Sequence, residues 1–265
     1  KPNADGSYDS FASDVAKRWP REELSDAERG LRCATGDDCL SKVRSDVPAY
    51  AAMVDKHRDW FGRLEAATAG DHLQSAFPPR LDTPFPAFQS TYLPATRYAV
   101  QFASGDQADA LAGVCARIVD WRRLGANTDL LLTAMVANGY TTGYARLAAE
   151  MLAELPAGAP LPGACEAAFV LPRPAESSLC LAMQGEYRNT NGMLESVTKS
   201  QAAAASVAVD DGGPFYDMAM TRAAMAANFA PFCAPANEAR TAADQPMPPA
   251  RYPGFIRLQC VANAV

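Results

Sequence analysis

The strongest limit on how this chain can fold comes from its prolines. The chain has 265 residues and 20 prolines, most of which gather in three stretches at about 78–94, 156–174 and 246–253. Proline lacks a backbone N–H and clashes with the preceding helical turn, so these stretches are expected to be irregular connectors. The segments between them are predicted to be helical, in blocks at about 8–76, 94–155 and 175–232, followed by a tail at 233–265.

One amphipathic helix stands out in the first block. Ser45 or Asp46 is expected to cap it, and Pro48 suits its first turn. Its apolar positions recur at alternating spacings of three and four residues, which is the pattern of one buried helical stripe. The stripe consists of Val47, Tyr50, Val54, His57, Phe61 and Leu64.

Helices also account for most of the other two blocks, and strand signals are scarce. In the second block the breaks at Gly105 and Gly125 predict helices near 95–103, 107–123, 127–138 and 141–155. In the third block the pattern predicts helices over 177–187 and 216–229. Residues 255–261 alternate in polarity and suit one short strand. The expected fold is all-α, a single compact helical domain over 1–265 with proline-rich connectors.

Seven cysteines indicate disulfides rather than a metal site. There is no Cys-x-x-Cys and there are two histidines, whereas zinc sites use paired ligands at short spacing. Pairing neighbours in the sequence suggests Cys33–Cys39, Cys165–Cys180 and Cys233–Cys260, one of about 15 ways to join six cysteines. Cys115 then remains as a free thiol, expected to be buried on an apolar helix face. Disulfides favour an oxidising compartment.

Charge and hydropathy narrow the classes of partner. The formal net charge is −6 with no cluster of Lys and Arg, which disfavours nucleic acids and anionic membrane surfaces. No apolar run approaches the roughly 20 residues of a transmembrane helix. The polar start Lys1–Ser7 is typical of a mature N-terminus without a signal peptide, and it is compatible with a lipid-anchored precursor.

The potential catalytic residues all lack partners in the sequence. His57 lies on the apolar stripe, where Asp55 and Asp59 are on other faces of its helix. His72 has no second ligand or nucleophile beside it. Ser196 and Lys199 match Ser-x-x-Lys without the companion motifs of that enzyme class.

One acidic pair and several aromatic residues complete the candidates. Glu186 could act as a general acid on a glycan only if a second carboxylate, from Asp210 or Asp211, lies at a set distance. The aromatic side chains could serve as interface anchors or complete the core, and they are Trp60, Tyr92, Tyr140 and Tyr252. The expectation is therefore no catalytic, cofactor-binding or metal site and no cofactor.

The stretch from Phe102 through Cys115 and Trp121 to Pro156 resembles exported proteins of high-GC Gram-negative bacteria. Some of those proteins are encoded beside toxic effectors of type IV or type VI secretion systems and act as immunity proteins. The resemblance implies a periplasmic protein, with or without a lipid anchor, that binds another protein such as a toxin. The expected function is a non-enzymatic exported binding protein; the alternatives are an envelope hydrolase acting on glycan or peptide and a cell-envelope assembly factor.

Overall fold

A computed structural model describes residues 17, 22–75, 77, 79, 83, 86–205 and 218–248, with the side chains of 199–205 left out. In this part of the chain the regular structure is helical and no strand occurs, which confirms the all-α expectation. A single β-bridge joins Leu73 to Thr128. No helix among these residues is long and apolar enough to cross a membrane. The strand expected at 255–261 lies outside the described residues.

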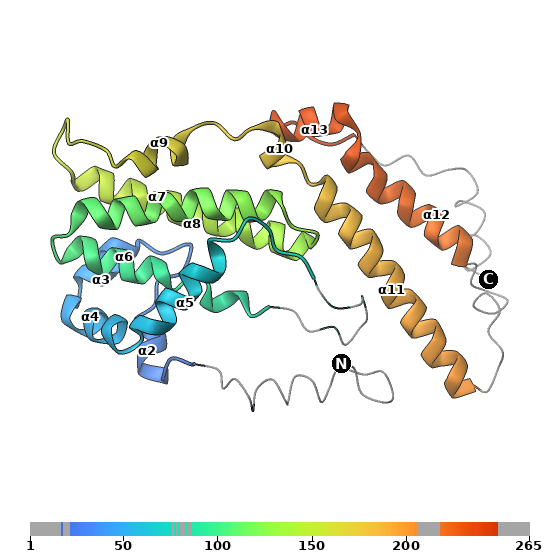
Figure 1. The fold of residues 1–265 in the computed structure, drawn as a ribbon, viewed down its shortest axis with the longest axis horizontal. Helices are drawn as coiled ribbons and strands as arrows, with labels where there is room; N and C mark the ends of the chain where they lie inside the picture. Colours follow the sequence, from blue (N-terminus) through green and yellow to red (C-terminus); the bar gives the residue numbers. More distant parts are fainter. Residues whose placement is uncertain are drawn as a thin grey trace.

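The helices follow one another along the chain as shown in Figure 1. They are α2 (Asp26–Gly30), α3 (Cys39–Arg44), α4 (Val47–Lys56), α5 (Arg58–Thr68), η1 (Phe88–Ser90), α6 (Pro94–Ala103), α7 (Gln107–Ala126), α8 (Leu131–Glu154), α9 (Gly163–Phe169), α10 (Pro174–Ser177), α11 (Cys180–Ala205), α12 (Met218–Phe229), η2 (Ala230–Cys233) and α13 (Pro235–Ala242).

The centre of the molecule is the antiparallel pair α7 and α8, against which α6, α3 and α9 pack (Figure 1). The facing side chains of the pair are buried and large, with Trp121 and Tyr144 among the biggest of them. A second, smaller cluster joins α4 and α5 to the start of α6, through Met53, Phe61 and Leu93. These helices form what we call the body, comprising α2 to α9.

The predicted stripe over 47–64 is buried in part, but the helix that carries it is interrupted. Asp46 caps α4 by accepting a hydrogen bond from the Ala49 backbone N–H, and Ser45 ends α3 instead. His57 leaves helical geometry, with φ −107° and ψ 21°, and separates α4 from α5. Because the backbone turns there, residues on both sides still face the core, and Tyr50 and Phe61 are buried.

The break expected near residues 139–140 is absent, since α8 runs without interruption from Leu131 to Glu154. Gly143 lies inside it for a packing reason. A Cβ at Gly143 would lie 2.5 Å from the Tyr92 hydroxyl, so only glycine lets the Tyr92 ring approach the helix. Glycine here therefore marks a close contact rather than a helix end.

The third block forms an arm that extends from the body (Figure 1). Helices α11 and α12 lie side by side, and an ion pair joins Arg222 to Glu195. Gly185 is the point where α11 meets the α7–α8 turn, because a Cβ there would overlap the Asp129 carbonyl oxygen. Helix α13 falls within the segment predicted as a tail, and it packs on α10.

Two of the three predicted disulfides are wrong. Cys33–Cys39 is present, but the other bridges are Cys115–Cys165 and Cys180–Cys233. Cys115 is buried as expected, yet it is not a free thiol, because its helix face packs against α9 and brings Cys165 within a Cα–Cα distance of 4.9 Å. Cys260 lies outside the described residues.

Candidate functional site

His57 has the carboxylate partners that its own helix could not supply. Its Nδ1 lies 3.2 Å from Glu22 Oε1 and its Nε2 lies 3.3 Å from Glu28 Oε1. Both glutamates come from the segment before and within α2, so no spacing rule along α4 and α5 could have found them. His57 thereby fastens residues 22–28 to the α4–α5 junction.

The two glutamates around His57 are also paired with cations. Glu22 meets Arg63, and Glu28 lies 2.7 Å from the Lys56 ammonium. The Lys56 hydrogen bond, aided by bonds from Ser25, lowers the pKa of Glu28 from 4.5 to about 2. The cluster therefore places a buried imidazole between two carboxylates, each of which also has a cationic partner.

The other catalytic candidates are not brought together in the described part of the chain. His72 is exposed in the loop after α5. Glu186 and Ser196 both lie on α11, ten residues apart, which at 1.5 Å per residue separates them by about 15 Å. The Lys199 side chain, Asp210 and Asp211 lie outside the described residues.

The aromatic candidates belong mainly to the core. The Tyr92 ring lies 5.0 Å from Tyr140 and 4.9 Å from Tyr144, and Tyr140 donates a hydrogen bond to the Phe88 carbonyl. Burial raises the pKa of Tyr92 well above its ordinary value. Trp60 is nearly buried beside His57. Tyr252 lies outside the described residues.

The arginines of α7 bind the ends of neighbouring helices through hydrogen bonds and ion pairs. Arg117 donates hydrogen bonds to the Glu65 carbonyl and the Thr68 hydroxyl at the end of α5. Asp120 lies between Arg117 and Arg123; burial raises the pKa of this carboxyl, and the two guanidinium groups oppose the shift. Arginine at a helix C-terminus satisfies carbonyls that have no partner within the helix.

Exposed apolar side chains flank α9, one before its first turn and three at and after its last, and we call this set the α9 ridge. Its four members are 49–85% exposed, and they are Leu161, Phe169, Val170 and Leu171. Sequence reasoning missed them because they lie in a proline-rich stretch expected to be an irregular connector. The uninterrupted run Phe169–Leu171, next to Pro172, was the available signal.

A disulfide and several hydrogen bonds join the backbone of the α9 ridge to the body. The Cys115–Cys165 disulfide joins α9 to α7. Arg122 donates hydrogen bonds to the carbonyls of Ala168 and Val170 at 3.2 and 3.1 Å, and lies 2.5 Å from Glu176. Burial alone would raise the pKa of Glu176, but hydrogen bonds from Arg173 and Arg122 outweigh it and lower that pKa. These bonds fix the backbone that carries the exposed side chains.

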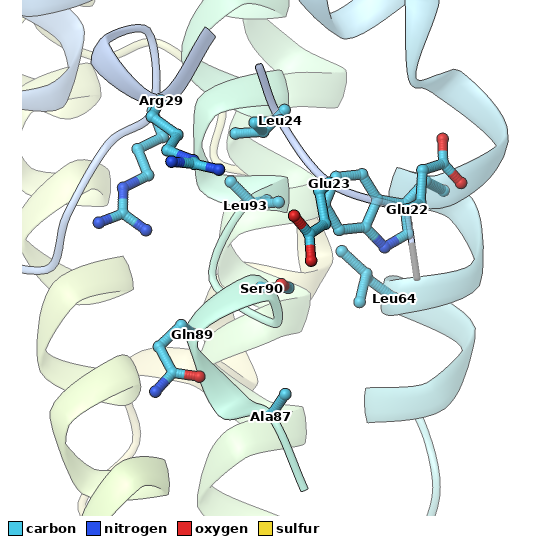
Figure 2. Close-up of a pocket in the computed structure, with 11 residues that line it drawn as sticks. Glu22, Glu23, Leu24, Arg29, Leu64, Ala87, Gln89, Ser90 and Leu93 are labelled. Atoms are coloured by element: carbon cyan, nitrogen blue, oxygen red, sulfur yellow. The ribbon is translucent and has the colours of Figure 1, made fainter. Parts of the chain in front are cut away.

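A pocket of about 500 Å³ opens on the other side of the body, and we call it the Trp60 pocket (Figure 2). Its floor is apolar, formed by Leu24, Trp60, Leu64 and Leu93. Polar side chains surround the floor, and they are Glu22, Glu23, Arg29, Arg32, Gln89 and Ser90. Residues from α2, α5 and the η1–α6 junction meet here, which no local sequence pattern indicated.

Comparisons of this chain with protein-family models, with curated proteins and with solved structures gave no match.

Proposed function

We propose that this chain is an exported binding protein that acts by holding another protein, and that the α9 ridge is its contact surface. The observation that carries the proposal is the exposure of Phe169, Val170 and Leu171 at 49%, 60% and 85%. Consecutive large apolar residues exposed on a fixed backbone are typical of an interaction surface.

The composition of the ridge suits a protein interface. Burial of a large, fully exposed apolar side chain contributes roughly 1.5–3 kcal/mol, so covering these four, which are 49–85% exposed, would contribute favourably to association. Arg173 is exposed at the edge of the ridge, and aromatic residues with arginine dominate the energetics of interfaces. The disulfide and Arg122 limit the entropy that the ridge would lose on binding.

Export is supported by the covalent structure. Three disulfides are compatible with a protein that matures in an oxidising compartment. The body has a large hydrophobic core, so the disulfides are not needed to compensate for a small one. A periplasmic location, with or without a lipid anchor, belongs to the proposal.

The specific role we propose is that of an immunity protein that occludes a toxin. The resemblance to exported proteins encoded beside secreted toxins supports it, and the acidic net charge of −6 would favour a basic partner. An envelope hydrolase is the alternative: Glu186 would need a second carboxylate from Asp210 or Asp211, and both lie outside the described residues. The described residues offer no specific observation in favour of an assembly factor.

The test is capture of a partner from the cell envelope of the parent organism. Wild-type protein is compared with Phe169→Asp and Leu171→Asp, and the matched control is Met135→Asp. Met135 is 64% exposed on α8 and is not part of the ridge. We expect one partner to be retained by the wild type and the control, lost with both ridge variants, and saturated near one equivalent in a titration.

Two results would contradict the proposal. A partner retained equally by the ridge variants would place the interface elsewhere. Turnover of a glycan, peptide or lipid by this chain alone, abolished by Glu186→Gln or Ser196→Ala, would make it an enzyme.

A further inference from the structure

The Trp60 pocket separates opposite charges across an apolar floor. Glu23 approaches from the segment before α2, whereas Arg29 lies across Leu24 and Leu93 from it, as Figure 2 shows. Arg32, which follows the end of α2, also lines the pocket. The pocket therefore has an acidic side and a basic side.

Only some of these charges are used by the protein itself. Glu22 is paired with Arg63 and His57, and Arg29 is paired with Asp26. The side chain of Glu23 makes no hydrogen bond or ion pair within the described part of the chain, and Arg32 makes none there either, although its charge helps to lower the pKa of Asp37. The pocket is thus lined by one carboxylate and one guanidinium that hold no ion pair among the described residues.

The uncharged residues of the pocket indicate the chemistry of the middle part of a ligand. Trp60, Leu64 and Leu93 offer an aromatic and aliphatic surface, and Gln89 and Ser90 add an amide and a hydroxyl without a described side-chain partner. A volume of about 500 Å³ is within the range of small-molecule sites. The complementary ligand is a zwitterion with an apolar middle and polar backbone groups.

We propose that the Trp60 pocket binds a short apolar peptide with free termini. The peptide ammonium pairs with Glu23, its carboxylate pairs with Arg32, and its side chains lie on the floor made by Trp60 and Leu64. The amide of Gln89 and the hydroxyl of Ser90 are placed for hydrogen bonds to the peptide backbone. This site is separate from the α9 ridge and does not depend on a protein partner.

The test is isothermal titration calorimetry with three probes: the dipeptide Leu-Leu, N-acetyl-Leu-Leu and Leu-Leu amide. Loss of one charge-assisted hydrogen bond should weaken binding by about tenfold or more, so the wild type is expected to prefer Leu-Leu over both blocked forms. Glu23→Gln should remove the preference over N-acetyl-Leu-Leu, and Arg32→Gln should remove the preference over Leu-Leu amide. Each variant should leave the other preference in place.

The matched control is Arg240→Gln, which removes an exposed arginine of α13, outside both the pocket and the ridge, and should keep both preferences. Equal affinity of the wild type for the three probes would overturn the proposal, and so would the absence of Leu-Leu binding at millimolar concentration. Both results come from unmodified protein, so they do not depend on whether a variant folds. Failure of the ridge experiment would leave these outcomes unchanged.

Discussion

Cys115 of α7 is bonded to Cys165 of α9, and neither residue exposes any surface to solvent. The bridge joins residues 50 apart in the sequence, and it lies directly beneath the segment that presents the α9 ridge. A single covalent bond therefore connects the centre of the core to the proposed binding surface.

This bridge should be the more stabilising of the two within the body. Loop-closure entropy predicts about 4 kcal/mol for Cys115–Cys165 and about 2 kcal/mol for Cys33–Cys39, whose sequence separation is 6. We expect Cys115→Ala/Cys165→Ala to lower the free energy of unfolding more than Cys33→Ala/Cys39→Ala does, as measured by urea denaturation. A larger loss of unfolding free energy in Cys33→Ala/Cys39→Ala would show that loop length does not determine which bridge is more stabilising.

Thiol counting tests the pairing directly. Six cysteines are bridged in the described residues, so the denatured, unreduced protein should react with one equivalent of a thiol reagent. Peptide mapping is expected to place the label on Cys260. A label on Cys115 would contradict the α7–α9 bridge.

Acid should weaken the cluster around His57 through Glu28. The folded state lowers the pKa of Glu28 from 4.5 to about 2, so the unfolded chain binds this proton more readily. The stabilisation is complete above pH 4.5 and is lost as the pH falls from there to about 2. Glu28→Gln, which can keep the hydrogen bond to Ser25, should cost stability near neutral pH and very little at about pH 2.

Urea denaturation at a series of pH values measures this difference. Glu23→Gln is the control, because Glu23 makes no ion pair in the described residues. A difference between wild type and Glu28→Gln that stays constant down to about pH 2 would mean that the Lys56 pair contributes nothing.

Two glycines inside helices should respond to alanine with opposite signs. A Cβ added at Gly139 of α8 would have no atom within 4 Å, so Gly139→Ala should stabilise the protein by about 0.5–1 kcal/mol. Gly185→Ala would press on the Asp129 carbonyl and should cost about 1–3 kcal/mol. Thermal denaturation followed by circular dichroism measures both, and a stabilising Gly185→Ala would mean that α11 does not rest on that turn.

Local patterns predicted the helices well and long-range contacts poorly. Proline positions and glycine breaks located α6 to within a residue, and the cap of α4 is Asp46, one of the two residues expected there. The stripe correctly placed Phe61 in the core. These features depend on residues that are close in the sequence, so local sequence patterns can predict them.

The features that the sequence did not predict share one physical cause, since each depends on which elements pack together. The burial of Cys115 was predicted from its apolar helix face. The same pattern would result whichever helix covered that face, so the sequence did not indicate that α9, with Cys165, covers it. The partners of His57 come from Glu22 and Glu28, about 30 residues earlier in the chain. The Trp60 pocket unites three elements, and its residues have no common spacing.

The three bridges do not overlap along the chain: each joins a cysteine to the next one in the sequence, at 33–39, 115–165 and 180–233. A polypeptide that reaches an oxidising environment N-terminus first presents its cysteines in that order. At each stage the newest thiol finds one older thiol still unpaired, and that thiol is its native partner. Correct pairing then follows from the order of arrival, with no need to break and remake a mismatched bridge.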